Sequence, residues 1–403
     1  MSVFLPWWGA IFVFPGWGTA SAQSSKVIEL KSARELNVKK IGDEEVRDFI
    51  GNVHFVQPAA GGGTVKVWCD RAQQFMTQGR IELLGNVKIV RDEVTLTSTR
   101  GTYYSATRRA KIQNGVRLEQ RGTVLTAREG DYFTDEKRAY FVGDVVILDS
   151  ASTTFSDALT YFEEGEKSIA VGNVKVVSPA DGVTVFGDSL VHFGEIDYTI
   201  VPKKPRLVQV DTSATGLLDT LVVVGKLMES YRDTSSRFIA RDSVLMVRNE
   251  LAARCGEATY RPREGLIVLL KQPVVWYAEN QVSGDSIAVR LEKHKLRSVY
   301  VGGRAMAVSR SDSSLKSRFD QLTGRQLTLY FANDDIERIE VIRNATSLYY
   351  LFESERPNGV NRSSGDKITV YFAEGQVEEI MVVGGVEGQY MPEPMIDQRE
   401  QKF

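Results

Sequence analysis

Hydrophobic and polar residues alternate along most of the chain in short runs, and these runs recur at a regular spacing. The stretch LLGNVKIVRD, residues 83–92, contains a glycine, a short polar residue and a valine, followed by further alternation. The same kinds of residue return in FIGNVHFVQ, IQNGVRLEQ, FVGDVVILD and AVGNVKVVS, and in IQNGVRLEQ the polar residue precedes the glycine. Alternation with a period of two is typical of strands that bury one face, so the pattern predicts a series of such strands.

The repeated valines set the period of the chain. They are Val53, Val87, Val116, Val145 and Val174, and the last three steps are 29 residues each. The first step is 34 residues, and its surplus falls in the QPAAGGG segment at 57–63. Self-similarity of this length predicts stacked supersecondary units, each of which contacts its neighbours in sequence.

Each unit has the same internal order. An alternating segment is followed by a polar turn, such as ATRRA, TDEKRA or EEGEK, and then by the next valine strand. Two extended runs joined by a tight charged turn predict an antiparallel hairpin. The glycine before each valine lies about midway between turns, where it predicts a bend or bulge. The predicted fold is therefore all-β, an elongated antiparallel solenoid of V-shaped hairpin repeats with a jelly-roll cross-section.

The second half of the chain repeats at a longer period. Its alternating segments open at Arg241, Gly284, Gly324 and Gly365, and they recur every 40 to 43 residues. Residues 201–216 fit neither repeat period and are predicted to be a linker or long loop. The predicted organisation is a signal peptide at 1–22, a β-repeat domain at 27–200, this linker, a second β-repeat domain at 217–395 and a tail at 396–403.

One face of the valine strands is apolar throughout, whereas the opposite face is mostly polar. The apolar face carries Val53, Phe55, Val87, Ile89, Val116, Leu118, Val145, Ile147, Val174 and Val176. Burial of such side chains stabilises a protein by roughly 1.5–3 kcal/mol each, so this stripe must leave water. Two interpretations remain open at this point. The stripe is either the packed core of a solenoid or the lining of a groove that takes long acyl chains.

Composition and charge narrow the classes of partner and location. Lys plus Arg number 50 and Asp plus Glu 52, so no bulk charge indicates a nucleic-acid partner. The apolar run near the N-terminus is followed by Ala20-Ser21-Ala22, which predicts a secretory signal cleaved after Ala22. The two cysteines, Cys69 and Cys255, lie outside any metal-ligand spacing and are expected to be buried thiols.

No catalytic constellation is evident in the sequence, and neither a metal nor another cofactor is expected. His54, His192 and His294 stand alone, which favours packing or surface roles. Five aspartates fall at corresponding repeat positions: Asp131, Asp157, Asp188, Asp285 and Asp366. They could form a carboxylate ladder for calcium or for a polysaccharide lyase, but close stacking of like charges favours turn capping instead.

The repeated motifs resemble those of the organic-solvent-tolerance (OstA-like) family. That family includes the periplasmic lipopolysaccharide-transport protein LptA and the N-terminal domain of its outer-membrane partner LptD. The residues that carry the resemblance are GNVHF 51–55, WCDRAQQF 68–75, GNVKI 85–89, LTAREGDYF 125–133, GDVVI 143–147, FSDALTYF 155–162, GNVKV 172–176 and GDSLVHF 187–193. The later segments 273–289 and 359–372 look like longer OstA-like proteins.

The resemblance implies a β-taco whose apolar interior holds acyl chains while the attached sugars stay in water. The expected protein is therefore non-enzymatic and periplasmic, which is compatible with an association with the outer membrane. It would bind lipopolysaccharide or a related glycolipid and carry it toward that membrane. Its expected partners are other lipopolysaccharide-transport components, joined by end-to-end β-strand addition, and further copies of itself, joined head to tail. The alternative is a structural envelope scaffold with a dry core and no lipid cargo.

Overall fold

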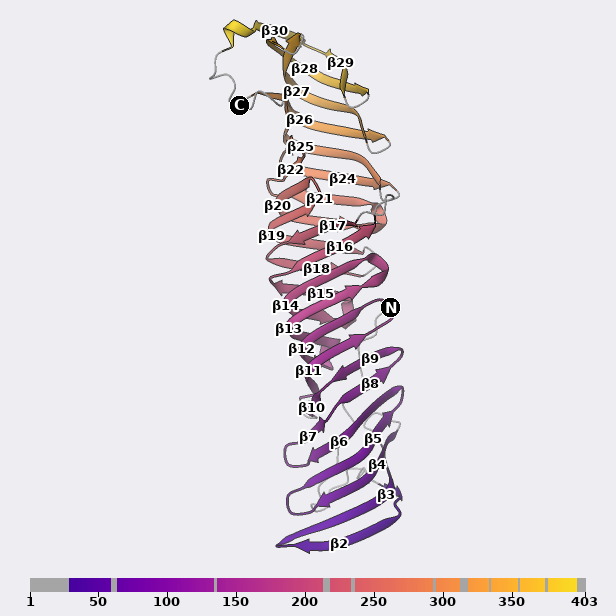
Figure 1. The fold of residues 1–403 in the computed structure, drawn as a ribbon. Coiled ribbons are helices and arrows are strands. Elements are labelled where there is room, and N and C mark those ends of the chain that lie inside the picture. Colours follow the sequence, from indigo (N-terminus) through magenta and orange to yellow (C-terminus); the bar gives the residue numbers. More distant parts are fainter. Residues whose placement is uncertain are drawn as a thin grey trace. The chain divides into compact units, whose positions relative to one another are not determined.

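The computed structural model describes residues 29–58, 64–133, 136–212, 218–232, 236–292, 295–311, 318–332, 335–353, 356–373 and 376–396. The chain divides into two compact units, Met1–Lys203 and Lys204–Phe403. The described elements of both units are strands and short 3-10 turns, so the prediction of an all-β antiparallel fold is confirmed (Figure 1). The predicted signal peptide at 1–22 lies outside the described residues, as does the predicted tail beyond Ile396.

The first unit contains fifteen described strands and three 3-10 turns. The strands are β1 (Glu29–Ser32), β2 (Glu35–Ile41), β3 (Glu44–Pro58), β4 (Thr64–Phe75), β5 (Arg80–Arg91), β6 (Val94–Tyr104), β7 (Arg109–Gln113), β8 (Val116–Gln120), β9 (Thr123–Ala127), β10 (Glu129–Phe133), β11 (Arg138–Leu148), β12 (Thr153–Phe162), β13 (Lys167–Ser178), β14 (Val183–Phe193) and β15 (Tyr198–Lys203). The turns are η1 (Glu164–Glu166), η2 (Pro179–Asp181) and η3 (Gly194–Ile196).

Most strands of this unit pair antiparallel with the next strand along the chain, as the hairpin repeat predicts (Figure 1). One repeat is built from split strands, because β6 pairs with both β7 and β8 while β11 pairs with both β9 and β10. The first half of each long strand forms one arm of the predicted V, and the second half forms the other.

The glycine motif marks a β-bulge at the bend between the two arms. Between β4 and β5 the register shifts at the motif, after Leu84 has paired with Arg71 and before Lys88 pairs with Trp68. Gly85 and Asn86, which lie within this shift, both have left-handed backbones, with φ of +72° and +44°. Glycine and asparagine adopt this conformation at the lowest cost, which explains why the motif repeats them.

The neighbouring strand supplies a carboxylate that fits directly over the bulge. Asp70 accepts a hydrogen bond of 2.9 Å from the Asn86 side-chain amide, and Asp157 accepts the same bond from Asn173 in a later repeat. A Cβ added at Gly85 would lie 2.2 Å from Asp70 Oδ2 and 2.9 Å from its Cγ. The motif therefore produces the bend, and its glycine leaves room for the carboxylate that caps the bend.

We expect the substitution Gly85→Ala to destabilise the first unit more than Gly115→Ala. Both glycines have positive φ, which costs an L-residue about 1–2 kcal/mol. Only at Gly85 must the added methyl also displace Asp70, since nothing lies within 4 Å of a Cβ at Gly115. Chemical denaturation of the two variants measures the difference, and equal losses of stability would contradict the capping role of Asp70.

The second unit contains fifteen further described strands and two 3-10 turns. They are β16 (Arg206–Thr212), β17 (Leu218–Val224), β18 (Leu227–Tyr231), β19 (Arg237–Arg248), β20 (Leu251–Arg261), η4 (Pro262–Glu264), β21 (Leu266–Leu270), β22 (Val274–Tyr277), β23 (Asn280–Ser283), β24 (Ser286–Glu292), β25 (Lys295–Arg310), β26 (Phe319–Ala332), β27 (Asp335–Glu353), β28 (Arg356–Ala373), β29 (Gln376–Val383), β30 (Glu387–Pro392) and η5 (Glu393–Met395). Strands β25 to β28 are longer than most of those in the first unit and pair consecutively, in agreement with the longer period of the sequence.

The segment predicted as a linker or long loop, residues 201–216, is mostly strand over its described part. Strand β15 ends at Lys203, and β16 begins at Arg206 and pairs with β17 from Arg206–Val224 to Thr212–Leu218. The sequence RLVQVDT largely alternates apolar and polar residues. This local alternation favours a strand, although the segment lies outside the regular repeat. Residues 213–216 lie outside the described part of the chain.

Within the part of the chain that the structure describes, no helix is long and apolar enough to cross a membrane.

Candidate functional site

The predicted apolar stripe forms the inner face of one arm in the first unit. Cross-strand pairing joins Phe55, Val67, Ile89, Leu96, Leu118, Leu125 and Ile147 into one continuous row. Eight of the ten predicted residues are buried, namely Val53, Val87, Ile89, Val116, Leu118, Val145, Ile147 and Val174, and Phe55 and Val176 are half-buried. The structure thus brings together the residues that the sequence predicted for this face.

The inner face of the opposite arm combines large residues with small ones. Its row runs through Leu83, Gly101, Ile112, Gly130, Phe141, Leu159, Ala170 and Leu190. A Cβ added at Gly130 would lie 3.0 Å from Phe141 and 3.6 Å from Val116, which belongs to the first arm. Phe49 and Phe55 also meet edge to face across the interior, with ring centroids 5.5 Å apart. The two arms therefore approach each other closely at Gly130 and are in side-chain contact at Phe49 and Phe55, so the interior is packed at these levels.

A ladder of tyrosines lies next to this row, closer to the hairpin turns. Tyr103, Tyr132 and Tyr161 are spaced by 29 residues, and each pairs across the sheet with at least one small residue, Ala110, Ala139 or Ser168. All three rings are almost fully buried. The hydroxyl of Tyr132 donates a hydrogen bond of 2.9 Å to Glu163, whereas that of Tyr161 has no hydrogen-bond partner among the described residues.

The facing arm ends in a row where buried polar side chains lie beside the buried Val65 and Val94. Arg91 follows Ile89 on the inner face of β5 and is 3% exposed, and Gln120 occupies the same cross-strand row through Val94. We call Arg91, Gln120, Tyr103, Tyr132, Tyr161 and Glu163 the rim of the first unit. The rim was not predicted from the sequence, although the 29-residue spacing of the tyrosines was a signal that could have revealed it.

The electrostatics of the rim reflect its burial. Burial raises the pKa of Tyr132 and of Tyr161. Burial also raises the pKa of Glu163, against the opposing effects of its bond from Tyr132 and of the charges of Lys137 and Arg91. The charge of Arg91 opposes the rise in the pKa of both Tyr132 and Glu163. Arg91 also forms an ion pair with Asp92 in the adjacent turn, at 3.5 Å from Nε.

Several of the histidines and aspartates considered in the sequence analysis contact other side chains in the structure. His54 stacks on Trp68 with centroids 4.7 Å apart, and His192 Nδ1 lies 2.9 Å from the Thr199 hydroxyl. His294 lies outside the described residues. Among the aspartates, Asp131 accepts two hydrogen bonds of 2.8 Å from Arg109. Among the described residues, no cluster of His, Cys, Asp and Glu could hold a metal ion.

The two cysteines are free and buried, as the sequence predicted. Burial raises the pKa of Cys69 to about 12 and that of Cys255 to about 11. Neither thiol is therefore a thiolate near neutral pH, and neither is a candidate nucleophile.

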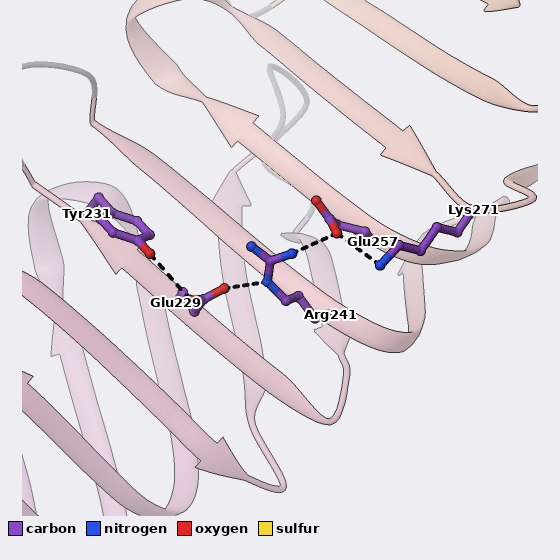
Figure 2. Close-up of polar contacts among 5 residues, drawn as sticks. All are labelled: Glu229, Tyr231, Arg241, Glu257 and Lys271. Carbon is purple, nitrogen blue, oxygen red and sulfur yellow. Dashed lines mark hydrogen bonds and ion pairs between the residues drawn. The ribbon is translucent and has the colours of Figure 1, made fainter.

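Ionisable groups also form a polar network in the second unit (Figure 2). Arg241 donates to Glu229 at 2.5 Å and to Glu257 at 2.7 Å, and Lys271 lies 3.2 Å from Glu257. Tyr231 donates to Glu229 at 3.4 Å. The charges alternate in sign across successive strands, so each carboxylate is neutralised by a cation. This arrangement braces the sheet at its bulge and leaves no free base or nucleophile within the network.

Comparisons with known proteins find a family match for one part of the chain. Residues 25–180 match the family model described as OstA-like protein. Among solved structures, one that is similar is LptH, the LptA homologous periplasmic component of the conserved lipopolysaccharide transport device from Pseudomonas aeruginosa. The match has 14% sequence identity, covers 35% of this chain and 95% of that chain, and has a TM-score of 0.28, which is too low to support an inference. No curated protein sequence matches the chain significantly.

Proposed function

We propose that this protein binds and transports lipopolysaccharide in the periplasm, a proposal supported by the match of residues 25–180 to the model of the OstA-like family. Acyl chains of lipopolysaccharide or a related glycolipid would enter the apolar interior of the first unit and move toward the outer membrane. The observation that carries the proposal is the unbroken inner row from Phe55 to Ile147, which is apolar on every strand. No step of this function calls on an enzymatic group or a cofactor.

The packing of the interior sets a condition on this function. A Cβ added at Gly130 would lie 3.6 Å from Val116 on the facing arm, and Leu118 is 2% exposed. An acyl chain can therefore enter only if the arms separate and exchange contacts with each other for contacts with the chain. Because both kinds of contact are apolar, the exchange costs little hydrophobic free energy.

The same packing favours a second candidate function, a structural envelope scaffold with a dry core. In that case the arms never separate and the inner row serves stability alone. The two candidates predict different partners for the same side chains, so they can be distinguished at individual positions.

Site-specific photo-crosslinking in cells tests the proposal. A small diazirine amino acid at Val87, Ile89, Val116 or Val145 should form adducts with lipopolysaccharide, whereas the same group at the outward-facing Lys88 should not. Adducts confined to the protein itself at all four inner positions would favour the scaffold. Native mass spectrometry of the purified protein then identifies any lipid that remains bound.

We also propose that the N-terminal edge of the first unit joins other lipopolysaccharide-transport components, or a second copy of the chain, by strand addition. Within the described residues β2 pairs with β3 alone, and all seven of its residues are exposed. Leu36 and Val38 are more than half exposed, which is unusual for apolar residues on a paired strand. The diazirine placed at Val38 should therefore form adducts with protein rather than lipid, and the mass of the adduct separates a partner from a second copy.

A further inference from the structure

The last described residues of the chain fold back over the second unit. Strand β30 pairs antiparallel with one arm of β28 over all six of its residues, and η5 follows it directly. The hydroxyl of Tyr390 donates a hydrogen bond of 2.9 Å to the backbone carbonyl of Asn358 on β28. We call residues 387–396, which comprise β30, η5 and the residue after it, the clasp.

The surface under the clasp is apolar although it belongs to the outward face of the sheet. Leu348 and Tyr350 lie three and five residues beyond the fully buried Ala345 on β27, so they point to the opposite face. The cross-strand partners of Leu348 on this face are both polar, namely Gln321 and Arg362. The two apolar side chains therefore require a cover that the sheet itself does not provide.

The clasp provides this cover. Leu348, Tyr350 and Val360 form a cluster in which each side chain is at most 8% exposed, and Met391 and Ile396 of the clasp pack against it. Apolar side chains on an outward face would otherwise remain in water, which is unfavourable. The outward positions of β27 and β28 thus form a docking surface that fits this segment.

An ion pair holds the end of the clasp. Arg318 donates from Nη1 to Oε2 of Glu393 at 2.8 Å, and from Nη2 to Oε1 of the same carboxylate. Its side chain is 11% exposed, and its guanidinium lies 5.3 Å from the centre of the Tyr350 ring. The surface therefore recognises a segment by its apolar side chains and by a carboxylate at one position.

The clasp is joined to β29 by a hinge of two glycines. Gly384 and Gly385 have φ of +77° and +57°, and a Cβ added at Gly385 would meet nothing within 4 Å. Glycine adopts an extended backbone as readily as this bent one, so the chain can straighten here without a steric cost. On the clasp itself Tyr390 and Met395 are half exposed or more, so its outward side is open to solvent.

We propose that two copies of this chain exchange their clasps, so that each clasp docks on Arg318, Leu348, Tyr350 and Val360 of the other copy. An exchanged clasp makes the same contacts as it makes within one copy, and only the hinge differs, so the exchange costs little beyond the freedom lost on association. An open clasp leaves the apolar cluster and the Arg318 charge without their partners, which favours docking in either copy. The inference goes beyond the proposed function, because it requires neither a lipid nor the N-terminal edge.

Cross-linking between two singly substituted chains tests the exchange. Arg362 on β28 and Gln389 on β30 are direct partners across the sheet, and both are exposed. Full-length chains with Arg362→Cys are mixed at high concentration with chains that carry Gln389→Cys, and the mixture is then oxidised. We expect a disulfide-linked heterodimer, because only an exchanged clasp pairs these two positions. The native Cys69 and Cys255 are buried and should not react.

A pair on the other side of the hinge is the matched control. Lys367 on β28 and Val383 on β29 are also direct partners. Strand β29 precedes the hinge and stays with its own copy, so a mixture of Lys367→Cys and Val383→Cys chains should give no heterodimer. Equal yields for the two mixtures would mean that copies associate without exchanging clasps, which overturns the proposal.

Weakening the ion pair should accelerate the exchange. Glu393→Gln in both chains removes the charge-assisted bonds from Arg318, so we expect the heterodimer to form about tenfold faster. Glu387→Gln is the matched control within the clasp, since Glu387 is exposed, and it should leave the rate unchanged.

The doubly substituted chain, with Arg362→Cys and Gln389→Cys together, shows whether the two positions can be joined at all. If it closes a disulfide within one copy while no mixture forms a heterodimer, even with Glu393→Gln, the clasp is a fixed part of the second unit and the proposal is wrong.

Discussion

Replacing Leu118 with alanine is expected to destabilise the first unit by about 3 kcal/mol, within the usual range for a buried leucine. Leu118 is among the largest fully buried side chains, and it pairs with Leu96 on one side and Leu125 on the other. Its removal leaves a cavity that both neighbouring strands line. Chemical denaturation measures the loss, and Glu119→Ala at the next, exposed position should change stability little.

The effect should also be local, because each repeat contacts mainly its neighbours. Hydrogen exchange is therefore expected to accelerate most in β6, β8 and β9, which carry the leucine and its two partners. A uniform acceleration over the whole unit would indicate one cooperative core instead. A loss well below 1 kcal/mol would mean that the interior at this level is an open groove, contrary to the burial of Leu118.

The local alternation of the sequence was sufficient to predict the strands and their inner faces. The side-chain period of a strand is two, so the position of Val87 relative to Gly85 fixes which residues share its face. The bend could be predicted too, because a glycine inside an alternating run usually marks a bulge or a sharp bend. The same logic failed where the bulge uses other residues. In β27 the left-handed positions are Arg343 and Asn344, and no glycine marks them.

The rim could not be predicted in the same way. The sequence shows that Tyr132 and Arg91 lie on inner faces, but it does not show that two arms meet at corresponding depths. That relation depends on the angle at the bulge and on the lengths of the arms beyond it. The packed state of the interior depends on the same geometry, since the alternation of Gly130 and Phe141 becomes informative only when Val116 is known to face them. The contact between the two arms therefore became evident only from the structure.

A second large effect is expected for the ion pair of Asp48 and Arg71 on strands β3 and β4. Arg71 donates from Nε to Oδ1 of Asp48 at 2.7 Å and from Nη2 to Oδ2 at 2.5 Å, and the carboxylate is 4% exposed. Lys39 lies further away, at 3.6 Å. Substituting Arg71→Gln leaves a buried carboxylate with its hydrogen bond from Gln73 and one distant cation. Breaking a fully buried pair costs about 3–5 kcal/mol, and since Arg71 is partly exposed we expect about 2 kcal/mol at pH 7.

The dependence on pH tests whether the loss comes from charge. The hydrogen bonds from Arg71 hold the pKa of Asp48 below its ordinary value of 3.8, despite the opposing effect of burial. A lowered carboxylate pKa means that the folded state binds fewer protons than the unfolded state as the pH falls. The pair therefore stabilises the protein fully above the unfolded pKa, and this stability is lost as the pH falls through the folded pKa. The gap in stability between Arg71→Gln and the parent protein should narrow below about pH 4.

A comparable pair elsewhere in the unit isolates the contribution of burial. Arg128 also contacts a carboxylate through two nitrogens, with Nε at 2.8 Å and Nη2 at 2.7 Å from Asp144 Oδ2, but both side chains are largely exposed. Arg128→Gln is therefore expected to leave stability nearly unchanged at either pH, because solvent and salt screen an exposed pair. If the two variants lost equal stability, burial of Asp48 would not be the cause. If the loss in Arg71→Gln persisted unchanged at about pH 3, it would come from the packing of the arginine stem against β3 rather than from its charge.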